Sequence, residues 1–325
     1  MSLVNHSNDE SHAVSGSSGR ASIGVSSCLM GQSVRFDGNH KKNNLVTECL
    51  GDKFNLVSIC PEVAIGMGVP RQPIRLMQTE KKTVRALGVR DPALDVTDEL
   101  RNFAIDMAPT LASFSGYVFK KDSPSCGLFG VKLYDTEGMP GKNGRGIFSE
   151  QVLHANANMP VEEEGRLSNF DLKDNFIKRV FIYHDWQSRL RLGLTCQSFE
   201  EFHRIHKFTL LAHDQPCYRR LGKYVADCTT SELSKRSEYY ITEFMNALKI
   251  IPTVDQNINV MMHIMGFLKR DITASDKAEL LRTMEKYRVG VVSKDVLITL
   301  IRYHLKNHPN QYLSSQHYLN HGMPI

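Results

Sequence analysis

The segment Phe54-Asn55-Leu56-Val57-Ser58-Ile59 runs directly into Cys60-Pro61-Glu62-Val63-Ala64-Ile65-Gly66-Met67-Gly68-Val69-Pro70-Arg71, and this junction decides how the first half of the chain folds. The first six residues form a short apolar run, which is typical of a buried strand. Pro61 cannot extend a strand ladder, so the backbone leaves the sheet directly after Cys60. A thiol followed two residues later by the carboxylate of Glu62 makes a poor core, and the junction therefore predicts a functional site.

Two further segments repeat this arrangement of a strand followed by a cysteine. Residues Ile23–Ser27 predict a strand that ends at Cys28, and residues Ser115–Lys120 predict a strand that leads into Cys126. Other patterns predict helices at Asn43–Leu50 and Asp98–Ser113 (with Thr97 or Asp98 as N-cap), an extended segment at Thr83–Val89 and a glycine-rich loop at Pro140–Gly146. Alternating strands and helices are typical of an α/β, Rossmann-like domain with a mainly parallel sheet. Ligands bind beyond the carboxyl ends of such strands, where all three cysteines are expected.

The second half of the chain has a different pattern. The acidic run in Val161–Arg166 is interpreted as a boundary, and apolar residues at helical spacing follow it almost throughout. We expect a disordered lead-in at residues 1–22, an α/β domain at 23–158 and an all-α domain at 168–325. Helices are predicted at Phe199–His213, Asn257–Leu268, Ala274–Val289 and Ser293–Asn307, the last with Ser293 as N-cap, and an irregular tail at Gln311–Ile325.

Composition and charge narrow the class of protein. The chain has 325 residues, of which 41% are hydrophobic and 23% charged, as in ordinary globular proteins. It lacks an apolar run of about 20 residues, which a membrane span requires, and its first residues lack a signal peptide's apolar region, so a cytoplasmic protein is predicted. The net charge is +5. Residues 1–160 carry 17 Lys and Arg against 16 Asp and Glu, and the remainder 23 against 19, so most of the basic excess lies in the helical half.

The seven cysteines are an odd number, which argues against a disulfide framework. Structural zinc usually takes four ligands, often in C-x-x-C pairs, and no such pair occurs here. Three well-separated cysteines suit an iron–sulfur cluster with one iron open, whereas electron-transfer clusters use four. Three unrelated buried thiols remain an equally good interpretation, because free cysteines are among the most buried residues.

Several polar residues near these cysteines have two interpretations. Glu62 is either a solvated loop carboxylate, the commoner case, or a general acid or base beside a metal. Ser123 and Ser125 either hydrogen-bond to turn backbone or, beside a metal centre, donate to a reacting oxygen or relay a proton. Four basic residues are either surface charges or contacts to a phosphate or a polar heterocycle: Arg71, Arg75, Lys120 and Lys121. Ser27 and Asp37 are further candidate contacts to the substrate or to RNA.

Basic and aromatic residues also cluster in the helical half. Lys207, Arg219 and Arg220, with neighbouring tyrosines, form either a solvated surface or a contact to an RNA backbone. His203 and His206 are three residues apart on one predicted helix, a weak signal for a metal site without further ligands.

Four blocks of the first half, in this order, resemble the thiouracil desulfidase (TudS-like) family: Val25–Gly31, Val34–Gly38, Cys60–Arg71 and Lys121–Gly127. The second half resembles the YbgA-type domain through Phe202-His203-x-x-His206-Lys207, Leu210–Asp214 and Tyr218-Arg219-x-Leu221-Gly222. The fusion of the two is similar to the tRNA 4-thiouridine desulfidases.

The resemblance implies a [4Fe-4S] cluster on Cys28, Cys60 and Cys126 with one open iron. It implies catalytic roles for Glu62 and Ser123, and a reaction that converts 4-thiouridine in tRNA to uridine with release of sulfide. The helical domain would then hold the tRNA. Two alternatives are a desulfidase of free thiouracil or another small thiocarbonyl, and a non-enzymatic RNA-binding or redox-responsive protein.

Overall fold

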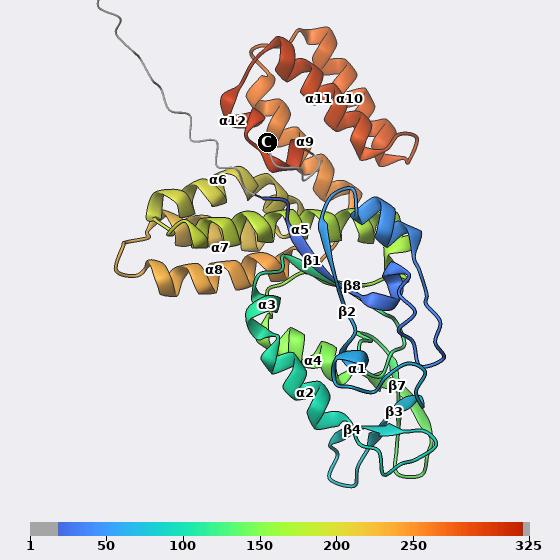
Figure 1. The fold of residues 1–325 in the computed structure, drawn as a ribbon. Helices are drawn as coiled ribbons and strands as arrows, with labels where there is room; N and C mark the ends of the chain where they lie inside the picture. The colour runs from blue at the N-terminus through green and yellow to red at the C-terminus, as the bar shows by residue number, and fades with distance from the viewer. Residues whose placement is uncertain (1–18, 321–325) are drawn as a thin grey trace, which may run out of the picture.

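The computed structural model describes residues 19–320, and its first half is built on a parallel sheet (Figure 1). The strands of this sheet, in the spatial order β2-β1-β5-β8, are β1 (Ser22–Ser26), β2 (Asn55–Ile59), β5 (Gly116–Phe119) and β8 (Val161–Glu163). All three neighbouring pairs are parallel. Val25 of β1 pairs with both Ser58 of β2 and Val118 of β5, so these strands end at nearly the same level. The predicted α/β fold with a mainly parallel sheet is confirmed.

Helices cover both faces of this sheet. One face packs against the first half of α5 (Phe170–Arg191) through a core that includes Ile23, Val25, Phe176 and Val180. The other face packs against α2 (Thr97–Asp106), α3 (Ala108–Ala112) and α4 (Ile147–Ala155). The predicted helix at 43–50 is a π-helix, Leu45–Leu50.

The predicted single helix at Asp98–Ser113 is wrong, because it is divided into α2 and α3 at Met107. Pro109 lies in the first turn of α3 and has no backbone N–H to continue the α2 ladder. The predicted N-cap is also wrong, since Val96 holds that position. The Thr97 hydroxyl instead donates to Asp95 and accepts the backbone N–H of Ala86.

A second sheet, in the order β4-β3-β6-β7, lies below the first in Figure 1. Its strands are β3 (Ile74–Gln78), β4 (Val84–Gly88), β6 (Val131–Tyr134) and β7 (Pro140–Gly144). Only β4 was predicted. The glycine-rich loop predicted at 140–146 is wrong, because β7 pairs antiparallel with β6. It is an edge strand that begins at a proline, a position where the missing N–H costs no ladder bond.

The acidic run interpreted as a boundary contains strand β8, and Glu162 and Glu163 are buried in it. This strand belongs to the parallel sheet but lies beyond residue 158, where the first domain was predicted to end. The domain limits themselves stay a prediction. Residues 1–18 of the predicted lead-in lie outside the described residues, whereas Ala21 is buried and Ser22 begins β1.

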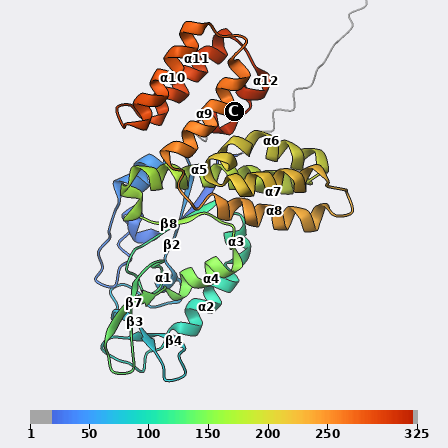
Figure 2. The ribbon, with the colours of Figure 1, turned by 180° about the vertical axis from the view of Figure 1, so that it is seen from behind.

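The second half is helical throughout its described part, as predicted (Figures 1 and 2). Its helices are α6 (Cys196–His213), α7 (Gln215–Ala226), α8 (Leu233–Ala247), α9 (Val254–Leu268), α10 (Ala274–Arg288), α11 (Lys294–Asn307) and α12 (Gln311–Ser314). Ser293 occupies the N-cap position of α11 without a side-chain hydrogen bond. The tail predicted to be irregular contains α12 and a 3-10 helix, His317–Leu319, and residues 321–325 lie outside the described part.

Helix α5 joins the two halves. Its first half packs on the sheet, while Trp186 near its end packs against α6 and α8. The Gln187 amide donates to the carbonyls of Ala112 and Phe114, which precede β5. Helices α6–α8 therefore lie at the amino edge of the sheet, opposite the edge where the strands carry the cysteines (Figure 1). No helix in residues 19–320 is long and apolar enough to span a membrane.

Candidate active site

The three predicted cysteines line one cavity of about 430 Å³. Cys28 lies in the 3-10 helix Ser27–Met30, directly after β1, and Cys60 precedes the short helix α1 (Pro61–Ala64), directly after β2. Cys126 lies in the loop that follows β5. The order of the parallel strands thus brings together three thiols that are far apart in the sequence.

Burial makes these thiols poor anions on their own. It raises the pKa of the Cys28 thiol to about 11 and raises the pKa values of Cys60 and Cys126 as well. A bound cation offsets this cost, because a metal replaces the proton on each sulfur. The Cys60 sulfur lies 3.9 Å from the Val34 carbonyl, and backbone hydrogen bonds from Glu62 and Val63 favour its thiolate form.

The three thiols line the cavity without forming a ready site for a single metal ion. Within residues 19–320, no group of three or more His, Cys, Asp or Glu side chains converges closely enough to hold one ion. An iron–sulfur cluster has a less stringent requirement, because each cysteine binds a different iron atom. Three cysteine thiols around one cavity are a donor set that such a cluster can use.

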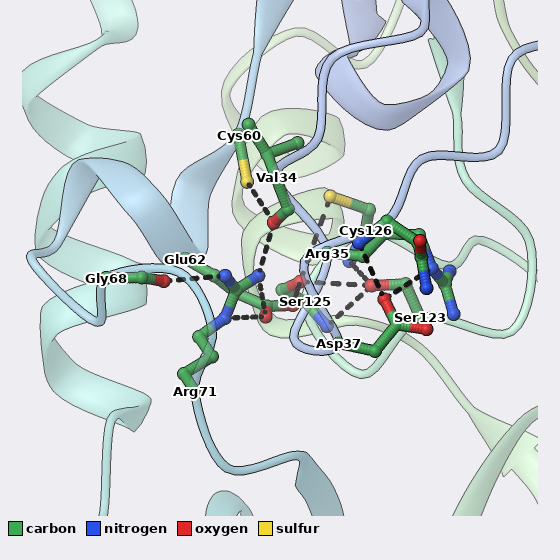
Figure 3. Close-up of polar contacts among 11 residues, drawn as sticks. Val34, Arg35, Asp37, Cys60, Glu62, Gly68, Arg71, Ser123, Ser125 and Cys126 are labelled. Carbon is green, nitrogen blue, oxygen red and sulfur yellow. Dashed lines mark hydrogen bonds and ion pairs between the residues drawn. The ribbon is translucent and has the colours of Figure 1, made fainter.

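Glu62 is held from two sides in this cavity (Figure 3). Arg71 donates to Glu62 Oε2 through Nε at 2.9 Å and through Nη2 at 2.7 Å. The same guanidinium donates to the carbonyls of Gly68 (2.8 Å) and Val34 (2.9 Å). The side chains of Arg71 and Glu62 are only 5% and 14% exposed. This buried ion pair fixes the orientation of the carboxylate, and Glu62 is not the solvated loop residue of the commoner interpretation.

The other oxygen of Glu62 begins a chain of hydroxyl groups. Ser125 Oγ donates to Glu62 Oε1 at 2.5 Å and lies 3.0 Å from Ser123 Oγ. Because a serine hydroxyl has one proton, Ser123 must donate to Ser125 in this arrangement. The backbone N–H groups of Ser125 and Cys126 donate to Ser123 Oγ and fix its position. A directed path thus runs from Ser123 through Ser125 to Glu62.

The acidic residues of β8 and its end hold the loop between β5 and β6. Glu164 pairs with the Lys120 ammonium and accepts the backbone N–H of Lys121. Glu163 accepts the backbone N–H groups of Leu128 and Phe129, just after Cys126. Sequence reasoning missed both roles and that of Ser125 as the direct partner of Glu62. The cluster of three consecutive glutamates after an apolar run was the only local signal for the acids.

Of the remaining contacts predicted in the first half, four line the cavity and two do not. The four lining residues are Ser27, Arg71, Lys120 and Lys121. Arg75 and Asp37 are not among the lining residues, and Asp37 lies in a neighbouring turn, where Arg35 is 3.6 Å away. Backbone hydrogen bonding at Asn39 lowers the pKa of Asp37.

Of the three basic residues predicted in the helical half, two line a groove and the third does not. Lys207 and Arg219 line an open groove of about 510 Å³ between α6 and α7, together with Arg204, Lys223 and the single carboxylate of Glu200. Arg220 is not among the lining residues and forms an ion pair with Glu243 of α8 at 2.5 Å. His203 and His206 bond to Tyr240 and Asp185 respectively, and among the described residues neither belongs to a metal-binding group.

Comparisons with known proteins agree with this division of the chain. The family model described as 2-thiouracil desulfurase matches residues 23–164, and a family described as protein of unknown function (DUF1722) matches residues 207–322. The uncharacterized protein YbbK of Bacillus subtilis (strain 168) is 32% identical over 111 residues, which are 32% of this chain and 71% of YbbK. The chain belongs to the 2-thiouracil desulfurase family.

Two other proteins are similar to parts of this family member. The uncharacterized protein YbgA of Escherichia coli (strain K12) is 28% identical over 156 residues, which cover 47% of this chain and 89% of YbgA. A solved structure titled "[4Fe-4S]-dependent thiouracil desulfidase TudS" is 30% identical and covers 47% of this chain and 97% of its own, with a TM-score of 0.37. The resemblances stated from the sequence motifs are confirmed for both halves.

Proposed function

We propose that this chain is an iron–sulfur-dependent desulfidase that converts 4-thiouridine in tRNA to uridine and releases sulfide. One observation carries the proposal: three cysteines line one cavity with Glu62 and Ser123, in a member of the 2-thiouracil desulfurase family. The cavity volume of about 430 Å³ falls within the range of small-molecule sites and accommodates a nucleobase.

Cys28, Cys60 and Cys126 would hold a [4Fe-4S] cluster through three of its irons. A bound cluster supplies a Lewis-acidic iron that polarises the C=S bond and takes up the sulfur. Glu163 and Glu164 fix the loop that carries Cys126, so this thiol is held in place before the cluster binds.

The protein's own groups then manage the water and its protons. Ser123 lies at the cavity end of the hydroxyl path, where it orients the attacking water and takes a proton from it. The proton passes through Ser125 to Glu62, the general base. Arg71 keeps the carboxylate in one orientation and compensates for its charge. Glu62 is thus the catalytic acid and base, and Arg71 is a positioning residue.

The groove between α6 and α7 supports a polynucleotide substrate. Arg204 is paired with Glu201, but Lys207, Arg219 and Lys223 still face the one lining carboxylate of Glu200, which suits a phosphate backbone. Tyr218 in the same groove offers an aromatic surface. The groove is lined by α6 and α7, which lie toward the amino edge of the sheet (Figure 1), whereas the cavity is lined by residues that follow the carboxyl ends of β1, β2 and β5. A free nucleobase does not extend across this distance, whereas a tRNA does, with its phosphates held away from the reacting base.

Anaerobic reconstitution with iron and sulfide tests the proposal, followed by nucleoside analysis of thiolated tRNA before and after incubation. We expect loss of 4-thiouridine, a matching gain of uridine and release of sulfide. Equal turnover of free thiouracil and tRNA would instead favour the small-molecule alternative. A colourless protein with stoichiometric zinc would refute the cluster.

Cysteine variants test the ligand assignment. Replacement of Cys28, Cys60 or Cys126 by alanine is expected to abolish the brown colour of the reconstituted protein. The matched control is Cys49→Ala, because Cys49 is a free, partly buried thiol that does not line the cavity. A normal cluster spectrum in Cys126→Ala would contradict the assignment.

A further inference from the structure

A second pair of thiols lies in the helical half, outside the cavity. The sulfur atoms of Cys196 and Cys228 are 3.9 Å apart, although the two residues are 32 positions apart in the sequence. Cys196 is the first residue of α6, and Cys228 lies in the connection between α7 and α8. Both are free and partly exposed, and neither lines the cavity of the proposed active site.

From this pair we infer a reversible oxidation site: Cys196 and Cys228 form a dithiol that small disulfides, such as oxidised glutathione, convert to an intramolecular disulfide. The sulfurs need to approach by roughly 1.9 Å, from 3.9 Å to the length of a disulfide bond. Cys228 lies in a loop and can make this adjustment, whereas Cys196 is fixed in the first turn of a helix. Partial exposure gives a small oxidant access to both sulfurs.

The chemistry is a two-step thiol–disulfide exchange. One protein thiolate attacks the oxidant, forms a mixed disulfide and releases one small thiol. The second protein thiol then displaces the other small thiol and closes the Cys196–Cys228 bond. The protein loses two electrons, the oxidant gains them, and the two protons are carried by the two released thiols.

The position of the pair gives the bond a structural consequence. Residues 196–228 contain all of α6 and α7, the two helices that line the basic groove. A bond between the ends of this segment closes it into a ring and fixes the connection to α8 against the start of α6. The other free thiol of this half, Cys217, is buried, so an oxidant in solution does not reach it.

Treatment of the full-length reconstituted protein with oxidised glutathione tests this inference under anaerobic conditions. Remaining thiols are then blocked by alkylation, and the protein is mapped by peptide mass spectrometry. We expect one cross-linked peptide pair that contains Cys196 and Cys228, its disappearance after dithiothreitol, and an unchanged cluster spectrum. A stable glutathione adduct at either residue without the cross-link would overturn the inference.

Single variants identify the resolving step. In Cys228→Ser the mixed disulfide cannot be resolved, so a lasting glutathione adduct on Cys196 is expected, and Cys196→Ser should trap the adduct on Cys228. Cys49→Ser is the matched control and should form the cross-link as fully as the unmodified chain. Absence of adducts in both single variants, with no cross-link in the unmodified chain, would show that the pair is inert.

Discussion

Replacement of Arg71 provides a quantitative test of the proposed positioning of Glu62. Arg71 makes four hydrogen bonds, two to Glu62 Oε2 and one each to the carbonyls of Gly68 and Val34, and its side chain is 5% exposed. Arg71→Met removes all four and leaves a mostly buried carboxylate without its countercharge. Breaking such a pair from one side costs about 3–5 kcal/mol. Arg71→Lys keeps the charge but loses the planar fork, so a smaller cost of about 1–2 kcal/mol is expected.

The assays are urea unfolding followed by circular dichroism, cluster absorbance and turnover. All three cysteines remain, so Arg71→Lys should keep the cluster spectrum while turnover falls by about 10–100-fold, because misplacement of a catalytic group by about 1 Å has effects of this size. The matched control is Arg85→Met. Arg85 also pairs with a carboxylate, Asp95, at 2.6 Å, but its side chain is 32% exposed, and exposed pairs contribute about 0–1 kcal/mol.

Two outcomes would refute this reasoning about Arg71. Equal destabilisation by Arg71→Met and Arg85→Met would show that burial of the pair is not what makes it strong. Unchanged turnover in Arg71→Lys would show that the orientation of Glu62 is not limiting. A double-mutant cycle adds a further check, since in a Glu62→Gln background the cost of Arg71→Met should fall because no buried charge is left uncompensated.

Three further predictions concern the hydroxyl path, a buried histidine and the basic groove. Ser125→Ala breaks the link from Ser123 to Glu62 and should lower turnover at least tenfold with an intact cluster spectrum, whereas unchanged turnover would exclude the path. Burial lowers the pKa of His213 from 6.5 to about 3. Between pH 6.5 and 3 only the unfolded chain protonates this histidine, so the free energy of unfolding decreases as the pH is lowered, by about 2 kcal/mol at pH 5. Urea unfolding of His213→Gln should show a smaller decrease over the same pH range. Arg219→Glu should weaken tRNA binding about tenfold and reduce its salt dependence, as measured by filter binding, and an equal effect from Arg220→Glu, which lies outside the groove, would place the RNA elsewhere.

The parts of the fold that the sequence predicts are those encoded by local apolar patterns. The strands before Cys28, Cys60 and Cys126 are short apolar runs, and the parallel-sheet rule places their ends together. In the second sheet only β4 was predicted, although β3 and β6 also contain alternating apolar residues. Its edge strand β7 has the sequence Pro-Gly-Lys-Asn-Gly, whose first four residues are exposed, and it exists through backbone pairing with β6. Side-chain periodicity therefore contains no signal for it.

In the candidate site, too, some residues are marked by local sequence and others are brought together only by the fold. The thiols and Glu62 are recognisable because proline and glycine mark them as loop residues, where a buried role is unusual. The partnership of Ser125 with Glu62 joins residues 63 positions apart, and no local pattern encodes it. Glu163 and Glu164 were interpreted as a charged boundary because charge runs are usually solvated. Glu163 is instead buried and Glu164 half-buried, and both bond to the loop after β5, which only the folded chain brings near.

Helix α5 contributes side chains to the hydrophobic cores of both halves. Phe176 and Val180 are fully buried, and Ile177 nearly so, in the same core as Ile23 and Val25 of the catalytic sheet. Burial of three such side chains contributes about 5–9 kcal/mol, which is comparable with the whole stability of a typical domain. A catalytic fragment that ends at residue 158 or 164 lacks this face of its core. The same helix then places Trp186 in the core of α6–α8, so whatever orders the helical groove also acts on the helix that covers the catalytic sheet.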